Sequence, residues 1–541
     1  MTTMTAGRAS SGKMTAEQKK VIFASSLGTV FEWYDFYIYG TLGVFLGKYF
    51  FSNVPPNVAF IFALLAFAAG FAVRPFGALI FGRIGDMIGR KYTFLVTMTL
   101  MGVGTFFIGV LPGYASWGIM APVILIALRL VQGLALGGEY GGAAIYVAEH
   151  APKDKRGFYT SWIQTTATLG LFMALLLILA IRTMMGEQAF GDWGWRIPFL
   201  LSAVLLAVSI WIRLSLNESP LFQQMVKEGT VSKRPLSEAF GVWSNAKIAI
   251  LALLGATAGE AVVWYGGQFY ALFFLTQTLK VPAVNAQIMI AIALLIGTPC
   301  FILFGWLSDR IGRKPIMMAG FALAAITYFP IFGGITHFAN PKLEAALNGS
   351  PIVVTADPAQ CSFQFKATGT ETFTTDCDKI KAALVGLSVN YTNQTAPAGT
   401  PASVKIGNDN LAGAAATPAA IAAAVKAHGY PAGADPNEIN YVMTVFLLVI
   451  LVVYVTMVYG PIAAWLVELF PTRIRYSGLS LPYHIGNGWF GGFLPATVFA
   501  IVATTGNIYS GLWYPIIVAC MSFFVALFFL PETKDRDITR M

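Results

Sequence analysis

The sequence predicts an all-α membrane protein whose twelve transmembrane helices form two six-helix halves, with a small extracytoplasmic insertion between the ninth and tenth helices. Its composition, its long apolar segments and an internal repeat lead to this prediction. Of the 541 residues, 56% are hydrophobic and only 11% are charged, whereas soluble proteins carry about 25% charged residues. So few charges cannot cover a water-exposed surface of this size, which argues against a soluble enzyme, a disordered scaffold or a nucleic-acid-binding protein.

The apolar segments are long enough to cross a bilayer, which takes about 20 mostly apolar residues. Five segments contain no Asp, Glu, Lys or Arg: 92–111, 158–181, 281–308, 315–336 and 439–467. Segments that carry a few charges complete the set, so the predicted spans are 22–47, 58–82, 91–111, 119–147, 158–181, 196–213, 248–275, 285–308, 315–337, 440–467, 476–502 and 509–530. The first 20 residues are polar, so we expect no signal peptide before the first span.

Basic residues orient these spans, because short cytoplasmic loops are rich in Lys and Arg. With both termini in the cytoplasm, the inner segments hold 23 of the 35 basic residues. The short outer ends hold only Lys48, Arg182, Arg196 and Lys280. The net charge of +9 is therefore explained by topology and gives no reason to expect nucleic acid as a partner.

Three patterns recur in the same order in the two halves of the chain. The stretch 82–91 returns at 305–314, an offset of 223; Gly28, Trp33, Tyr34 and Tyr39 return as Gly259, Trp264, Tyr265 and Tyr270, an offset of 231; and Glu149-x-x-Pro152-x-x-x-Arg156 returns as Glu468-x-x-Pro471-x-x-x-Arg475, an offset of 319. The rise from 223 to 319 places about 96 extra residues in the second half, which fits the polar stretch 338–439.

The repeat and the insertion together divide the chain. The predicted parts are a cytoplasmic tail (1–21), an N-terminal half (22–213), a cytoplasmic linker (214–247), helices 7–9 (248–337), the insertion (338–439), helices 10–12 (440–530) and a cytoplasmic tail (531–541). In the insertion, the runs 351–355, 362–365 and 387–391 suggest strands and the Ala-rich tract 412–427 suggests a helix, as in a small α+β cap. A surface decoration is favoured over a substrate-capturing domain. Cys361 and Cys377 face an oxidising compartment and are expected to pair.

Ionisable side chains at bilayer depth are costly and are therefore functional candidates. Seven of them lie in predicted spans: Glu32, Asp35, Arg74, Arg129, Glu139, Glu260 and His484. The two guanidiniums suggest an anion site, because Arg binds carboxylates through a planar, permanently charged fork. An equally open alternative is that they only pair with Glu32, Asp35 or Glu139 to hold helices together.

The carboxylates suggest proton coupling, since partial burial brings their titration toward neutral pH. For Asp35 this interpretation is favoured over a structural pair, and for Glu139 and Glu260 both interpretations stay open. His484 is better explained as a hydrogen-bonding wall residue than as a titrating group. Tyr34, Gln132 and Tyr265 are candidates to line a cavity, against the alternative of helix packing.

The repeated loops carry a further pair of candidates. Asp86 and Asp309 are expected to accept hydrogen bonds from helix ends or from Arg90 and Arg313, and so to latch the halves when the inner side is closed. A simple topology anchor explains the basic residues of these loops but leaves the repeated Asp and Gly unexplained.

These residues carry a family resemblance over the whole chain except 338–439. The paired Gly-x-x-x-Asp-x-x-Gly-Arg-Lys loops resemble the signature of the major facilitator superfamily. Further motifs resemble its metabolite:proton symporters, which carry citrate, α-ketoglutarate, shikimate, proline or betaine: Phe31-Glu-Trp-Tyr-Asp-Phe36, Arg74-Pro-Phe-Gly77, Arg129-Leu-Val-Gln-Gly133, Gly137-Gly-Glu-Tyr140 and Glu218-Ser-Pro220. Met87, at an often basic position, and His484, where many relatives have Asn, depart from the pattern.

The resemblance implies alternating access, with substrate bound between the halves. By position, Arg74 and Arg129 are expected to contact the substrate, and Glu32 and Asp35 to couple protons. We expect a monomeric, multi-pass protein of a bacterial inner membrane that imports a small organic acid with protons. The alternatives are an osmoprotectant importer and a proton-antiporting exporter. No nucleophile motif or metal-ligand spacing is present, so neither an enzyme nor a metal or cofactor is expected.

Overall fold

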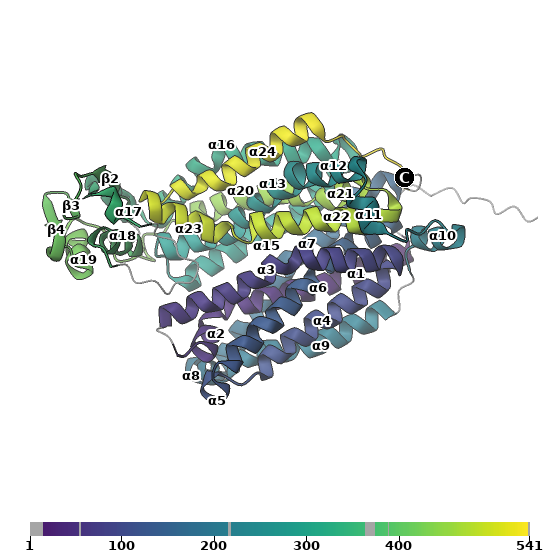
Figure 1. Cartoon of the computed structure of the whole chain (residues 1–541), viewed down its shortest axis with the longest axis horizontal. Coiled ribbons are helices and arrows are strands. Elements are labelled where there is room, and N and C mark those ends of the chain that lie inside the picture. The colour runs from purple at the N-terminus through teal and green to yellow at the C-terminus, as the bar shows by residue number, and fades with distance from the viewer. Residues whose placement is uncertain (1–14, 54–55, 215–217, 363–373, 388, 539–541) are drawn as a thin grey trace, which may run out of the picture.

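The N-terminal half is a bundle of long helices in a computed structural model that describes residues 15–538, apart from 54–55, 215–217, 363–373 and 388. Its helices are α1 (Ala16–Thr41), α2 (Gly43–Phe50), α3 (Pro56–Met87), α4 (Arg90–Val110), α6 (Met120–His150), α7 (Arg156–Met185) and α9 (Ile197–Leu214). The short helices α5 (Tyr114–Trp117) and α8 (Glu187–Asp192) lie in connections at one end of the bundle (Figure 1). The linker forms α10 (Pro220–Glu228) and α11 (Pro235–Phe240) at the opposite end.

The C-terminal half is a second bundle that lies alongside the first (Figure 1). It contains α12 (Trp243–Ala252), α13 (Ala258–Tyr265), α14 (Ala271–Phe273), α15 (Ala283–Ile311), α16 (Arg313–Ala339), α20 (Tyr441–Tyr459), α21 (Ile462–Leu469), α22 (Arg475–Ile485), α23 (Leu494–Thr505) and α24 (Trp513–Phe529). Among the described residues, nine helical segments are long and apolar enough to cross a membrane. In the part of the chain that the structure describes, α1, α3 and the interrupted segment α22–α23 occupy the other three predicted spans. This arrangement of two helical bundles confirms the predicted fold class.

Several predicted spans are not continuous α-helices. The predicted span 22–47 breaks at Leu42, between α1 and α2. The seventh span contains three π-helical turns, Leu253–Thr257, Gly266–Tyr270 and Phe274–Thr278, and the eleventh contains one, Gly486–Gly491. A π-turn inserts an extra residue without changing hydropathy, so composition gives no sign of it.

The insertion is a small α/β domain at the end of the molecule opposite α10 and α11 (Figure 1). Its helices are α17 (Pro341–Gly349), α18 (Asp376–Gly386) and α19 (Pro418–Ala427). Its strands β1 (Ile352–Ala356), β2 (Thr392–Thr395), β3 (Ser403–Ile406) and β4 (Asp409–Ala412) form a sheet in the order β2-β1-β3-β4. Strand β1 pairs parallel with β2 and antiparallel with β3, with Val353 opposite Thr392 and Lys405.

The strand predictions for the insertion were partly wrong. The run 351–355 coincides with β1, but 387–391 precedes β2, because α18 extends to Gly386. Ser362 lies outside any strand, and 363–365 fall outside the described residues. Strands β3 and β4 were missed. The alternation of buried and exposed residues in β3 is only four residues long, and β4 is mostly exposed and has no alternation.

The insertion docks on the helix ends of the C-terminal half that lie opposite α10 and α11. The amide of Tyr391 donates to the Gly506 carbonyl over 2.8 Å, and the amide of Ile508 donates to Asn390 Oδ1 over 2.7 Å. The amide of Ala434 donates to the Lys280 carbonyl over 3.2 Å. The insertion is therefore held by the ends of both π-containing segments, the seventh and the eleventh.

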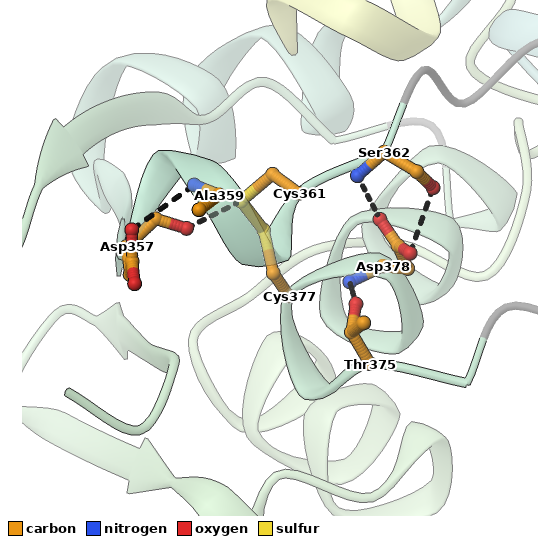
Figure 2. Close-up of a disulfide and its surroundings, with 7 residues drawn as sticks. All are labelled: Asp357, Ala359, Cys361, Ser362, Thr375, Cys377 and Asp378. Atoms are coloured by element: carbon orange, nitrogen blue, oxygen red, sulfur yellow. Dashed lines mark hydrogen bonds between the residues drawn. A yellow bond between two sulfur atoms is a disulfide. The ribbon is translucent and has the colours of Figure 1, made fainter. Parts of the chain in front are cut away.

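The structure joins Cys361 and Cys377 in a disulfide that attaches the start of α18 to the segment after β1 (Figure 2). Beside it, Asp378 accepts hydrogen bonds from the backbone amide and the hydroxyl of Ser362, over 2.8 and 2.7 Å. The bridge spans 16 residues.

Breaking this bridge is expected to loosen the insertion without unfolding the bundle. In the chain-entropy model, closing a loop of about 15 residues stabilises by about 3 kcal/mol. Cys361→Ser should therefore make the insertion more sensitive to limited proteolysis, whereas Cys520→Ser, in α24, should not. An unchanged cleavage rate in Cys361→Ser would show that the bridge contributes little to the stability of the insertion.

Candidate functional site

A chain of buried hydrogen bonds links Arg129 to Asp35 inside the N-terminal half. Arg129 Nη1 donates to Gln132 Oε1 over 2.7 Å, and Gln132 Nε2 donates to Thr105 Oγ1 over 2.6 Å. The Thr105 hydroxyl lies 3.0 Å from Asp35 Oδ2. Since α1, α4 and α6 each contribute a member, the chain couples the position of the guanidinium on α6 to the carboxylate on α1.

The second guanidinium, that of Arg74 on α3, is buried against aromatic rings. Its Cζ lies 4.3 Å from the ring centre of Phe71 and 5.8 Å from that of Phe36. Pro75 follows it and has no backbone N–H, so it cannot donate to the Phe71 carbonyl one turn earlier. Gly488 of the C-terminal half packs against that carbonyl: a Cβ atom added at Gly488 would lie 3.0 Å from the Phe71 carbonyl oxygen. Arg74 therefore sits at the interface between the halves.

The C-terminal half presents buried polar groups toward this interface. Glu260 Oε2 accepts a hydrogen bond from Asn487 Nδ2 over 2.9 Å, while Glu260 Oε1 has no hydrogen-bond partner. Neither imidazole nitrogen of His484 has a partner either, although the residue is only 2% exposed. The positive charge of Arg74 interacts across the interface with the side chains of both His484 and Tyr265. Buried polar atoms are seldom left unpaired, so these are groups suited to meet a ligand.

Aromatic rings from both halves meet beside these groups. The Trp33 and Trp264 rings are 5.2 Å apart, and Tyr37 stacks on Phe269 at 5.7 Å. Phe71 meets Tyr265 edge-on at 6.1 Å. Because each pair joins the two halves, the rings close the interface beside Arg74.

The remaining candidates lie elsewhere. The Tyr34 hydroxyl donates to the Pro198 carbonyl over 2.8 Å, so this side chain packs within the N-terminal half and not against Tyr265. Gln132 belongs to the Arg129 chain. Glu139 lies on α6 with Oε1 3.9 Å from Arg213 Nη2. The side chain of Glu32 falls outside the described residues.

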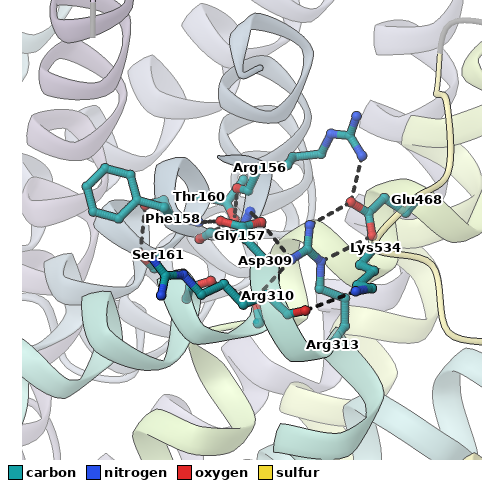
Figure 3. A network of polar contacts seen from close by, with 12 residues as sticks. Arg156, Gly157, Phe158, Thr160, Ser161, Asp309, Arg310, Arg313, Glu468 and Lys534 are labelled. Carbon is teal, nitrogen blue, oxygen red and sulfur yellow. Dashed lines mark hydrogen bonds and ion pairs between the residues drawn. The ribbon is translucent and has the colours of Figure 1, made fainter. Parts of the chain in front are cut away.

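At the end of the bundles that carries the linker helices α10 and α11, the two halves are joined by carboxylates that bind helix N-termini. Asp309, at the end of α15, accepts hydrogen bonds from the amides of Gly157 and Phe158 at the start of α7, over 2.8 and 2.7 Å (Figure 3). Asp86, at the end of α3, accepts them from Tyr476 and Ser477 at the start of α22, over 3.1 and 2.8 Å. A helix N-terminus favours negative charge, so each loop of one half holds a helix of the other.

Arginines complete both loops. Arg313 pairs with Asp309 at 2.7 Å (Figure 3). Arg90 lies 3.5 Å from Asp86 and donates to the Thr472 carbonyl over 3.0 Å. The two loops are thus used in the same way on both sides of the pseudo-symmetric interface.

Two buried ion pairs also cross between the halves. Arg156 pairs with Glu468 at 2.6 Å (Figure 3), and Arg475 pairs with Glu149 at 2.8 Å. These are the four residues of the repeated Glu-to-Arg motif. Sequence reasoning used that motif only to find the duplication and gave its residues no role.

A further repeat was missed at the sequence level. Glu218 accepts a hydrogen bond from the Lys91 amide over 3.1 Å, and Glu532 accepts them from the amides of Arg313 and Lys314, each over 3.0 Å. The two acids are 314 residues apart in the sequence, and each precedes a hydroxyl residue. Ser219 follows Glu218 and donates to Glu149, and Thr533 follows Glu532 and donates to Glu468. The sequence signal for this repeat was an acid followed by a hydroxyl residue after each half: Glu-Ser after the N-terminal half and Glu-Thr after the C-terminal half.

Two six-helix halves that meet around buried polar groups are the architecture of a multi-pass membrane transporter. The family model described as "Sugar (and other) transporter" matches residues 20–253 and 384–541, more than half of the chain. The protein therefore belongs to this family, within the major facilitator superfamily.

Relatives from Escherichia coli K12 are named for different substrates. The chain is 36% identical to the shikimate transporter over 323 residues, which is 58% of this chain and 72% of that protein. It is 36% identical to the proline/betaine transporter over 328 residues, 58% of this chain and 64% of that protein. It is also 36% identical to an inner membrane metabolite transport protein over 344 residues, 63% of this chain and 75% of that protein.

A solved structure shares the fold. The proton:xylose symporter XylE, bound to 6-bromo-6-deoxy-D-glucose, superposes with a TM-score of 0.64 and 15% identity, covering 97% of this chain and 98% of the other.

Proposed function

We propose that this protein is a proton-coupled symporter that imports a small organic acid by alternating access. The observation that carries the proposal is the buried hydrogen-bonded chain from Arg129 to Asp35, with Arg74 nearby at the interface. A carboxylate substrate that pairs with these guanidiniums changes the electrostatic environment of Asp35, which links substrate binding to the protonation of that residue. Arg74 and Arg129 bind the substrate, and Asp35 carries the proton.

The other candidates have supporting roles in this proposal. Tyr265 and His484 contact the substrate from the C-terminal half, and Gln132 holds Arg129 in place. Glu32, Glu139 and Glu260 are further proton-coupling groups, and Tyr34 fixes α1 beside the site.

The cytoplasmic contacts are the proposed inner gate. Asp86, Arg90, Asp309 and Arg313 hold it closed, so the structure corresponds to the state in which the inner side is sealed. When the carboxylates release the opposing helix ends, the halves part and the substrate leaves toward the cytoplasm. The relatives' names and the distribution of basic residues support a location in a bacterial inner membrane with both termini inside. In this proposal the protein acts as a monomer.

A second candidate substrate class is an osmoprotectant zwitterion. The observation that favours it is the aromatic cluster of Trp33, Tyr37, Trp264 and Phe269, since stacked rings attract quaternary ammonium groups. A betaine carboxylate also satisfies Arg74, so the guanidiniums do not separate the two classes.

Uptake into proteoliposomes distinguishes an organic acid from an osmoprotectant zwitterion as the substrate. The panel contains citrate, α-ketoglutarate, succinate, shikimate, betaine and proline, each with and without an inward proton gradient. Accumulation of an acid only with the gradient supports the proposal. Accumulation of betaine or proline alone assigns the second class, and uptake indifferent to the gradient contradicts proton coupling.

A further inference from the structure

A small cavity lies inside the N-terminal half, separate from the interface between the halves. Its volume is about 20 Å³, and Asp35 and Glu139 both line it. Its other lining residues come from α1, α4, α6 and α9: they include Gly28, Met98, Gly102, Ser202 and Ser209. Because all of its walls belong to one half, the cavity is not part of the proposed substrate path.

Both carboxylates have acceptor atoms that the protein leaves unused. Asp35 Oδ1 has no hydrogen-bond partner, and neither carboxylate oxygen of Glu139 has one. Asp35 is 7% exposed and Glu139 fully buried. A cavity of this size accommodates about one water molecule, and a buried water is stabilised where it meets two or more polar groups. Asp35 and Glu139 provide two such groups in the lining of this cavity.

The other charged or titratable groups around Glu139 are few. Arg213 approaches it from α9, with Nη2 3.9 Å from Oε1, and the Arg213 guanidinium lies against the ring of Phe94 on α4. Asp35 acts on it electrostatically from α1. From the C-terminal half, Tyr476 acts on it electrostatically, and its hydroxyl donates to the carbonyl of Gly138. The side chain of Glu32 is outside the described residues.

Tyr476 connects this region to the inner gate. Its backbone amide donates to Asp86, and its ring packs against Gly85 and Gly142 so closely that no side chain fits at either glycine. Tyr476 therefore packs on the turn of α6 that carries Glu139 while the gate is closed. When the halves part, Tyr476 leaves together with α22 and uncovers this turn.

We propose that Glu139 is a proton relay between Asp35 and the cytoplasm, reached through one water in this cavity and uncovered when Tyr476 withdraws. Protonated Asp35 gives its proton to the water, which passes one of its own protons to the Glu139 carboxylate. Asp35 is left anionic and Glu139 neutral, and Glu139 then releases the proton on the cytoplasmic side, where Arg213 stabilises the carboxylate that remains. The proton thus leaves by a path that the substrate does not use. This inference rests on the proposed proton coupling at Asp35.

The test separates coupled transport from substrate movement in proteoliposomes. Glu139→Gln is expected to keep substrate counterflow within about threefold of wild type but to lose at least about tenfold in gradient-driven accumulation. Because glutamine cannot titrate, the pH dependence of efflux should also flatten. Glu139→Asp, which keeps a carboxylate, should recover part of the accumulation and the pH dependence.

The cavity itself is tested by a matched pair of glycine variants on α4. Gly102 lines the cavity, and Gly109 lies two turns further on, outside it. A Cβ at either position would approach side chains of α9 to 2.9 Å, so the two substitutions crowd the same pair of helices. Gly102→Ala should lower accumulation at least about fivefold with counterflow preserved, whereas Gly109→Ala should stay within about twofold of wild type.

The outcomes distinguish this inference from the proposed function. If Asp35→Asn loses accumulation but Glu139→Gln accumulates like wild type, the relay is wrong and coupling at Asp35 stands. If both variants accumulate like wild type, the proposed proton site fails together with the relay. If Glu139→Gln loses counterflow as well and Glu139→Asp recovers nothing, Glu139 has a structural role only, and the relay is overturned.

Discussion

Replacing Arg475 by alanine is expected to shift the protein toward the inward-open state by about 10²- to 10³-fold. Arg475 pairs with Glu149 across the inner interface at 2.8 Å, and both side chains are fully buried. Removing one partner of a buried ion pair leaves an uncompensated charge, which costs about 3–5 kcal/mol. The cost falls on the closed state, because Glu149 regains water when the halves part, and each 1.4 kcal/mol changes an equilibrium about tenfold.

Spin labels on the two halves measure this shift. Lys153→Cys and Arg310→Cys place labels at exposed cytoplasmic positions of opposite halves, in a background without Cys300 and Cys520. Arg475→Ala should move the distance distribution to longer values. Arg182→Ala is the matched control, since its pair with Glu187 is 40% and 73% exposed and contributes little. An unchanged distribution in Arg475→Ala would mean that this pair does not hold the gate.

Arg74→Lys is expected to raise the KM for the transported acid about 100-fold, with a smaller effect on the amount of folded protein. A lysine keeps the charge but loses the planar fork that binds both oxygens of a carboxylate. It also loses much of the stacking on Phe71 that holds the guanidinium at the interface, where its Cζ lies 4.3 Å from the ring centre.

The control for this variant is a second buried arginine of the same half. Arg196 donates to the carbonyls of Gly109 and Leu111 over 2.9 and 2.8 Å and lies against Trp195. Arg196→Lys therefore removes a buried guanidinium that has no place in the proposed site, and its KM should stay within about threefold of wild type. Equal KM changes in both variants would indicate a general loss of packing and would remove Arg74 from the substrate site.

The fold class was predictable because its signal is local. Each bilayer crossing needs about 20 apolar residues, so hydropathy suffices to place the spans along the chain. The break at Leu42 and the π-turns Gly266–Tyr270 and Gly486–Gly491 were not predictable, because they leave the apolar pattern unchanged. Strand β4 was missed because a short, exposed strand has no periodic apolar face, and β3 was missed because its alternation of buried and exposed residues covers only four residues.

The site was predictable only as a set of unusual residues. A charge at bilayer depth identifies Asp35 or Arg129 as a candidate, but the chain between them runs through Thr105, a common helix residue with no such signal. Likewise Asp86 was marked by the repeated loop, whereas its partners, the amides of Tyr476 and Ser477, are 390 residues or more away. Contacts of that separation depend on how the halves meet, which no local pattern encodes.

The central claim, that Asp35 couples the entry of substrate to the entry of a proton, is tested most directly by recording proton entry. Proteoliposomes with a pH-sensitive dye inside receive substrate under no pre-set gradient. Wild type should acidify the lumen when substrate is added outside, and Asp35→Asn should show substrate counterflow without acidification. Substrate entry into wild-type vesicles with no change in luminal pH, or full acidification in Asp35→Asn, would contradict the account.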